Sequence, residues 1–365
     1  MQKAARRQRI SQSEWAYLAI LIFLILFPHI VGWLTGDSPT GLRGRPVGLS
    51  VFWQGVFIEV FILAILAMSY NLIFGFTGVI SFGHALFFGI GGYTLGIALE
   101  KSELGVDAGL LVGVIAGIVI AVLLSLFVGV VSLRLRGVYF AMFTLAIAEM
   151  FFIYFSRLPL TDAEDGFSIG ALPDWLNPTR NRLAFYYIVL VVFVLTFVSI
   201  RRLLHSPTGA VFLAIRENEE RARAIGYHTL TFKLLAISVA GMLAAIAGML
   251  HILFNKKVGP EILSLTFTVD PLLMTIIGGI GTFSGPVIGA AGLHLSDRLF
   301  RDATVTLGGA TINIGNSWTL LLGIAFIIVV MIFPQGVVGT WTRWRMQRKT
   351  PDPPQKSAAA PGAKP

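Results

Sequence analysis

Three carboxyl groups and one imidazole lie within long apolar stretches of the sequence: Glu59, Glu149, Asp270 and His84. A charged group inside a membrane span is costly, so each is a functional candidate, such as a proton relay or a contact for a polar substrate. We expect Asp270 and His84 to line a translocation pathway. The alternative for each of the four is a satisfied buried group or one that reaches the membrane interface.

Signatures of catalysis are missing from the sequence. The six histidines are scattered, with no His-x-x-x-His pair and no carboxylate at ligand spacing. There is no P-loop and no His-Glu-x-x-His motif, so the usual phosphate cradle for ATP is absent. Because the chain has no cysteine, thiolate metal sites and disulfides are excluded. We expect neither enzyme activity nor a metal or cofactor bound by this chain.

The composition is that of a membrane protein. Of 365 residues, 55% are hydrophobic and 13% are charged, whereas a soluble domain carries about 25% charged residues. The formal net charge of +9 could indicate a nucleic-acid partner. The basic residues, however, gather at the N-terminus, in short loops and in the C-terminal tail. We therefore expect contact with a lipid bilayer and none with nucleic acid.

The apolar stretches predict an all-α membrane protein with about ten transmembrane helices. The basic N-terminus resembles a signal peptide, but its apolar run is longer than a typical h-region and no clear cleavage site follows, so we interpret it as an uncleaved span. The predicted spans are 15–34, 52–74, 79–99, 109–133, 138–156, 183–204, 232–254, 266–282, 284–300 and 317–334.

The charges predict how these spans are oriented. If residues 1–14 form a cytoplasmic N-terminus, ten spans place the C-terminus in the cytoplasm as well. In that arrangement 18 of the 28 lysine and arginine residues fall in or beside inner segments, as the positive-inside rule predicts. Lys256 and Lys257 disagree, because they fall in a predicted outer loop. Residues 15–343 would form the transmembrane domain, and the basic, Pro- and Ala-rich residues 344–365 a disordered cytoplasmic tail.

Glycines interrupt the predicted spans at 79–99, 266–282 and 284–300. In a bilayer, irregular backbone is tolerated only where it faces protein or a water-filled cavity, and glycine-broken segments in both halves indicate a substrate path. Small-residue helix packing is the alternative explanation. The candidate lining residues are Asn71, Ser81, His84, Asp270, Gly279 and Gly281.

Two polar segments outside the spans are candidate partner sites. The charged, helix-prone residues 216–226 must lie in water, where we expect a docked partner; the alternative is a solvated surface helix. The expected helix has acidic residues near its start and basic residues after them, in agreement with the helix dipole. These are Glu217, Glu219, Glu220, Arg221 and Arg223. The outer loop 157–182 is too long for a simple connection and could receive an external partner.

Several motifs together resemble one known family. They occur in the family's order and cover most of residues 50–340. The motifs are Ser69–Gly78 with Ser81–Ala85, Arg136–Met142, Ser206–Gly209 with Ala214–Glu219, and Ile277–Thr282 with Gly285–Pro286. As a set they resemble the inner-membrane permease of branched-chain amino acid ABC importers, the LivM-type subunit, of which urea permeases are close relatives.

This resemblance implies an all-helical fold with two related halves, like that of type II ABC importer permeases. It also implies a multi-pass protein of the bacterial inner membrane. The implied partners are a LivH-type second permease, two ATP-binding subunits that use the ATP, and an extracytoplasmic solute-binding protein.

The resemblance further implies that residues 205–231 couple this chain to the ATP-binding subunits. Many ABC permeases carry Glu-Ala-Ala-x-x-x-Gly here; in this chain Arg221 replaces the first Ala, and the usual downstream Ile-x-Leu-Pro is missing. The implied coupling residues are Arg216, Glu217, Glu219, Glu220, Ala222 and Gly226.

The substrate and two other function classes stay open at this point. A branched-chain or other hydrophobic amino acid comes first, followed by urea or short amides and then aromatic acids, since the binding protein supplies most of the selectivity. A proton- or sodium-coupled secondary transporter would use Asp270, His84 and Glu59 as relay groups. A membrane enzyme would need His84 and a carboxylate to meet in one layer.

Overall fold

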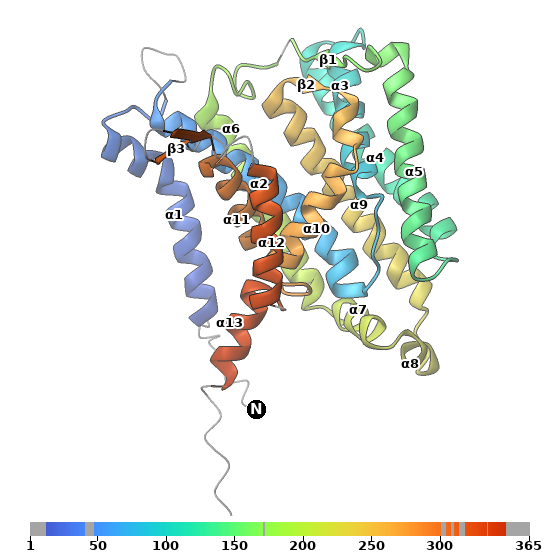
Figure 1. Cartoon of the computed structure of the whole chain (residues 1–365). Coiled ribbons are helices and arrows are strands. Elements are labelled where there is room, and N and C mark those ends of the chain that lie inside the picture. Colours follow the sequence, from blue (N-terminus) through green and yellow to red (C-terminus); the bar gives the residue numbers. More distant parts are fainter. Residues whose placement is uncertain are drawn as a thin grey trace, which may run out of the picture.

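The computed structural model describes residues 12–40, 47–170, 172–300, 304–307, 310–313, 318–333 and 335–347. Each of the ten predicted apolar segments contains a helix, which confirms the all-α class (Figure 1). These helices are α1 (Gln12–Thr35), α2 (Leu49–Thr77), α3 (His84–Glu100), α4 (Val106–Ser132), α5 (Val138–Arg157), α6 (Arg182–Leu204), α9 (Thr229–Asn255), α10 (Thr266–Gly278), α11 (Gly285–Phe300) and α12 (Trp318–Ile332).

The helices fall into two length classes. Six of those described, α1, α2, α4, α5, α6 and α9, have 20 to 29 residues and are apolar enough to cross a membrane. The other four, α3, α10, α11 and α12, have 13 to 17 residues. A full crossing takes about 20 residues. The shorter helices are therefore too short to cross a membrane alone, and they pack against the helices around them.

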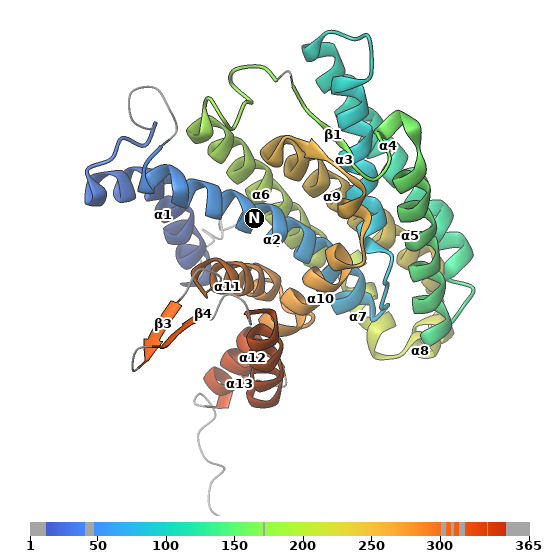
Figure 2. The same ribbon diagram turned by 45° about the horizontal axis from the view of Figure 1, so that its top comes forward.

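The long helix α2 forms the centre of the bundle. Inside the protein 83% of its apolar stretch is buried, compared with 28% for α4 and 22% for α5. The apolar outer sides of α1, α4, α5 and α6 are exposed, as expected of surfaces that face lipid or another membrane subunit. Helices α4 and α5 form one flank and α11, α12 and α13 (Gly336–Gln347) another, with α2 between them (Figure 2).

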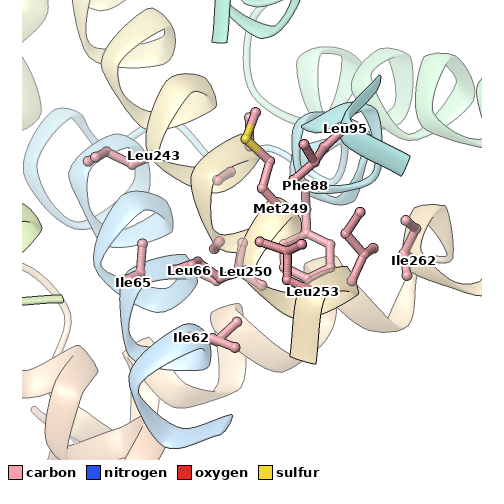
Figure 3. Packing of buried hydrophobic residues seen from close by; sticks show 14 of the residues in the cluster. Ile62, Ile65, Leu66, Phe88, Leu95, Leu243, Met249, Leu250, Leu253 and Ile262 are labelled. Atoms are coloured by element: carbon pink, nitrogen blue, oxygen red, sulfur yellow. The ribbon is translucent and has the colours of Figure 1, made fainter. Parts of the chain in front are cut away.

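Close helix packing around α2 explains many of the glycines. Figure 3 shows Leu66 of α2, Phe88 of α3 and Leu250 of α9 packed together in the core. A Cβ at Gly91 would overlap the backbone of Ala245, and one at Gly248 would overlap the carbonyl oxygen of Phe88. The alternative of small-residue packing therefore holds for the contact between α3 and α9.

The first break in the helical order follows α2. Gly78 adopts φ 75° and ends the helix, and the chain then runs back along α2 without helical structure. The hydroxyl of Tyr70 donates to the carbonyl of Ser81 (3.1 Å), and Ser69 hydrogen-bonds His84 (2.8 Å). Helix α3 therefore begins beside Ser69, which is about 12 Å above the end of α2 at 1.5 Å per residue. The helix begins five residues after the predicted start of this span at residue 79, since residues 79–83 are not helical.

The second break lies between α10 and α11. Helix α10 begins at the level of the α3 start, because the amide of Ala85 donates to Thr268 (2.8 Å). It ends at Gly278, four residues before the predicted end, and residues 279–284 turn the chain into α11. Gly279 and Gly281 have φ 125° and 71°, values that favour glycine. We call residues 78–83 the first break and 279–284 the second break.

Short strands tie the loops together at the upper end of Figure 1. Strand β1 (Phe167–Ser168) pairs antiparallel with β2 (Lys257–Val258), so the long loop 158–181 is joined to the link between α9 and α10. The 3-10 helix η1 (Pro159–Thr161) lies in the same loop, and η2 (Pro260–Leu263) follows β2. Lys257, which disagreed with the predicted orientation, lies 3.6 Å from the carboxylate of Glu261. A separate hairpin pairs β3 (Thr304–Leu307) with β4 (Ala310–Asn313).

The basic segments gather at the lower end of Figure 1. The start of α1, the loop between α4 and α5, the end of α13 and two short helices, α7 (Pro207–Glu217) and α8 (Glu219–Ala224), all lie there. Helix α13 continues to Gln347, past the predicted start of the tail at residue 344. The predicted N-terminal segment before residue 12 and the predicted tail from residue 348 fall outside the described residues.

Candidate functional site

The charged segment forms two short helices rather than one. Asn218 has extended backbone, and its side chain accepts a hydrogen bond from the amide of Arg221 (2.9 Å), which makes it the N-cap of α8. Glu219 and Glu220 lie in the first turn of α8 and its arginines in the last turn, as the helix dipole favours. The expectation for Glu217 was wrong: it ends α7, because Asn218 interrupts the helix.

Glu219 attaches α8 to the start of α9. Its carboxylate accepts hydrogen bonds from Lys233 (2.6 Å), Arg223 (2.7 Å) and Thr229 (3.0 Å). Partial burial raises the pKa of Glu219, but the hydrogen bond and charge of Lys233, with Thr229 and Arg223, lower it further, so the net pKa lies below its ordinary value. Ala222 is buried against Val211 and Ile215 of α7. Glu219 and Ala222 thus hold α7, α8 and α9 together.

The outer surface of this segment carries both charges and apolar groups. Glu217, Glu220 and Gly226 are exposed, and Gly226 has φ 99° with nothing within 4 Å of a Cβ built on it. Ile225 is 67% exposed although it lies in a polar segment. Exposed apolar side chains mark interaction sites when several of them form a contiguous patch. The sequence analysis missed Ile225, since its exposure cannot be read from a single isoleucine.

Arg216 is exposed, yet its guanidinium reaches the helix bundle. Its guanidinium donates a hydrogen bond to the carbonyl of Gly75, in the last turn of α2. A positive charge is favourable at the C-terminal end of a helix. A Cβ on Gly281 would collide with the same guanidinium, so Arg216 also lies directly against the second break.

Asn71 holds the second break from the other side. Its side-chain amide donates to the carbonyl of Thr282 (2.9 Å), and its oxygen accepts from the amide of Gly281 (3.0 Å). A Cβ at Gly75 would lie 2.6 Å from the Gly281 nitrogen and would overlap the Asn71 side chain. Gly279 packs against Gly336 at the start of α13. The structure thus brings three predicted pathway residues, Asn71, Gly279 and Gly281, to one place beside Arg216.

Ser81 and His84 lie in a second cluster, higher in the bundle. His84 is fully buried and bonded to Ser69. The amide of Phe82 donates to the hydroxyl of Thr144 (3.1 Å). A cavity of about 10 Å³ lies beside Ser81 and Thr144, large enough for about one water molecule. Thr144 and Thr268, which cap this break, were not predicted, because they lie far from it in the sequence.

Asp270 is half-buried in the first half of α10. In the described part of the chain no hydrogen bond or ion pair joins Asp270, His84 and Glu59; Glu59 instead pairs with His294 (2.8 Å). The relay proposed for a secondary transporter is therefore not formed as a contiguous chain. Among the described residues no group of three or more histidine, aspartate or glutamate side chains could hold a metal ion.

Comparison with known proteins identifies the family. Residues 53–333, which include both breaks and α7–α8, match the permease component of the branched-chain amino acid transport system. The chain belongs to this family. The resemblance drawn from the motifs is thereby confirmed, and the protein is a multi-pass permease.

Curated members of this permease family extend the match. The chain is 27% identical to the high-affinity branched-chain amino acid permease LivM of Salmonella typhimurium, over 76% of this chain and 68% of that protein. It is 26% identical to the probable LivM of Methanocaldococcus jannaschii, over 67% and 78% respectively. The similarity to LivH of Escherichia coli is lower, at 22% identity over 76% of this chain and 91% of LivH.

Proposed function

We propose that this chain is the LivM-type translocation subunit of an ABC importer that brings branched-chain or other hydrophobic amino acids across the bacterial inner membrane. The observation that carries the proposal is the α7–α8 segment. It is a charged pair of short helices between the long apolar helices α6 and α9, in a chain that the permease family matches on both sides of it. Such a segment supports the docking of ATP-binding subunits, which would supply the energy.

The distribution of charge supports a cytoplasmic position for α7 and α8. The lower end of Figure 1 carries the basic segments described above, and the positive-inside rule assigns such an end to the cytoplasm. Both termini of the chain would then be cytoplasmic. The opposite end, with the β1–β2 pairing and the long loop, would face an extracytoplasmic binding protein.

The similarity to both LivM and LivH supports a second permease as partner. Two related subunits can pack side by side and enclose a path that neither encloses alone. The exposed apolar faces of α1, α4, α5 and α6 offer surface for such a partner as well as for lipid. The complete importer would hold this chain, a LivH-type permease, two ATP-binding subunits and the binding protein.

The test is ATP-driven uptake by the complete importer, purified through a tag on this chain and reconstituted in liposomes. We expect uptake of labelled leucine that isoleucine and valine compete away and that requires ATP. Competition by urea, a short amide or an aromatic acid without an amino group instead would correct the substrate. Uptake that survives without ATP-binding subunits but collapses with the ion gradient would refute the importer.

The docking role of α7–α8 has a separate test at Ile225. Ile225→Asp places a charge on the exposed apolar surface without changing a buried contact, so we expect loss of the ATP-binding subunits during purification. Gly226→Asp is a less clean probe, because the φ of 99° at Gly226 makes any side chain there strained. Normal co-purification and normal uptake with Ile225→Asp would remove α8 from the docking surface.

A further inference from the structure

The last turns of α2 meet the second break beside Arg216 of α7. Gly75, three residues before the first break, leaves no room for a Cβ beside the Gly281 nitrogen of the second break. Asn71 holds Gly281 and Thr282, and Arg216 lies against both Gly75 and Gly281. One residue of α7 thus contacts the end of α2 and the second break together.

The two ends of the α7–α8 unit are attached to different parts of the bundle. At one end, Glu219 ties α8 to Thr229 and Lys233 of α9. Ahead of Asn218, Arg216 reaches from the last turn of α7 to the second break. The buried contacts of Ala222 with Val211 and Ile215 keep the two short helices together. A displacement of this unit is therefore applied to the break through Arg216.

The second break is the part that can respond. It lacks the repeating hydrogen bonds of a helix, and its glycines at 279 and 281 adopt φ values open mainly to glycine. Changing a few backbone dihedrals in such a turn is how hinges absorb movement while the helices on either side stay rigid. Helices α10 and α11 would then change their relative position at this end of the bundle.

We infer that Arg216 and Asn71 form a joint that transmits movement of α7–α8 to the second break and so opens or closes the cytoplasmic end of the path. This inference rests on the proposed importer function. Arg216 is a positioning residue here: it acts through the backbone of Gly75 and the second break.

The first test measures coupling in the complete reconstituted importer. Arg216→Ala is expected to reduce the amino acid transported per ATP hydrolysed by about tenfold, while the importer still assembles and hydrolyses ATP. Arg216→Lys, which retains a cation that can donate to Gly75, should recover most of the coupling. Arg202→Ala removes an exposed arginine from the last turn of α6, at the same end of the bundle as Arg216. The importer with this substitution should transport as the unaltered importer does.

A second test follows the break itself, and the absence of cysteine from this chain allows two spin labels to be placed on it, in an importer whose partner subunits have had their cysteines replaced. Val130→Cys on α4 and Ile288→Cys on α11 are exposed positions near this end of the bundle. We expect the distance between the labels to change when the importer is trapped with ATP, and this change to disappear in Arg216→Ala.

The outcomes distinguish a failure of the proposed joint from a failure of the proposed importer function. An unchanged ratio of transport to ATP hydrolysis in Arg216→Ala, or an unchanged distance shift, overturns the joint while the importer stands. Failure of both Arg216→Ala and Arg216→Lys to assemble also overturns it, because Arg216 would then serve folding alone. If the unaltered importer fails to transport with ATP, the proposed function itself is wrong.

Discussion

The first and second breaks are built in different ways from similar glycine-containing segments. The first break, with the adjoining Ala85, is anchored to three helices, through Tyr70 of α2, Thr144 of α5 and Thr268 of α10. The second break is held mainly by Asn71 and lies against Arg216. Irregular backbone in this permease therefore has two different roles. One break is a fixed part of the framework, and the other is attached to the segment that we propose to move.

The largest expected effect comes from filling the close contact between Gly75 of α2 and the second break. Gly75→Val would drive a branched side chain into Asn71 and the second break, where even a Cβ lies 2.6 Å from the Gly281 nitrogen. We expect the free energy of unfolding, measured by SDS titration in mixed micelles, to fall by about 3 kcal/mol or more. Gly292→Ala is the matched control, since a Cβ at Gly292 meets nothing within 4 Å. Equal stability of Gly75→Val and the control would refute the tight junction.

A smaller effect is expected where the first break is capped. Thr268→Val keeps the size of the side chain but leaves the buried amide of Ala85 without its acceptor. The unfolding free energy should fall by about 2 kcal/mol, the cost of an unsatisfied buried donor. Thr266→Val, at an exposed position of the same helix, should change it little. If Thr268→Val reduced coupling while stability stayed normal, the first break would not be a fixed framework.

The sequence predicted the helices well and the breaks poorly. Hydropathy identifies apolar segments, but Val79 and Ile80 are apolar and yet not helical, since hydropathy reports depth in the membrane and not backbone conformation. The hydroxyl caps at Thr144 and Thr268 are 62 and 183 residues from their partners, so no local pattern reveals them. Asn218 could have been predicted, because Asn before two glutamates is a helix N-cap signal.

The candidate site was predicted as a list of residues but not as an arrangement. Glycine content singled out Gly279 and Gly281, and the motif around Asn71 singled out that side chain. That Asn71 binds the second break, 210 residues away, required the fold. Arg216 was predicted as a coupling residue, but its hydrogen bond to Gly75 was not, because a charge next to an apolar helix end can face solvent or a carbonyl group.

The two hydrogen bonds between Asn71 and the second break should be detectable by hydrogen exchange. Asn71→Ala removes both hydrogen bonds to this turn, so the amide of Gly281 should exchange about tenfold faster, which corresponds to about 1.4 kcal/mol. Peptides covering residues 78–83 should keep their exchange rates. Equal acceleration in both breaks would show that they open as one unit, and the comparison between them would fail.

The smallest effect is expected at the attachment of α8 to α9. The side chain of Glu219 is 31% exposed, so Glu219→Gln should lower the unfolding free energy at neutral pH by about 0.2–1 kcal/mol. Because the folded pKa of Glu219 is lowered from 4.5, the contribution is present above that pH and is lost as pH falls through the folded pKa. The variant and the unaltered protein should therefore converge in acid, which unfolding titrations from pH 8 down to about pH 2 would measure.

Helix α10 is a rod 13 residues long, or about 20 Å, with a separate attachment at each end. Its upper end continues through η2 and β2 to the strand partner in the long loop, and its lower end runs into the turn beside Arg216. In the proposed importer, the binding protein and the ATP-binding subunits would therefore act on opposite ends of this one short helix. Substitutions in the long loop and in α7 should therefore suppress or worsen one another, and a genetic screen for compensating pairs would find them at these two sites.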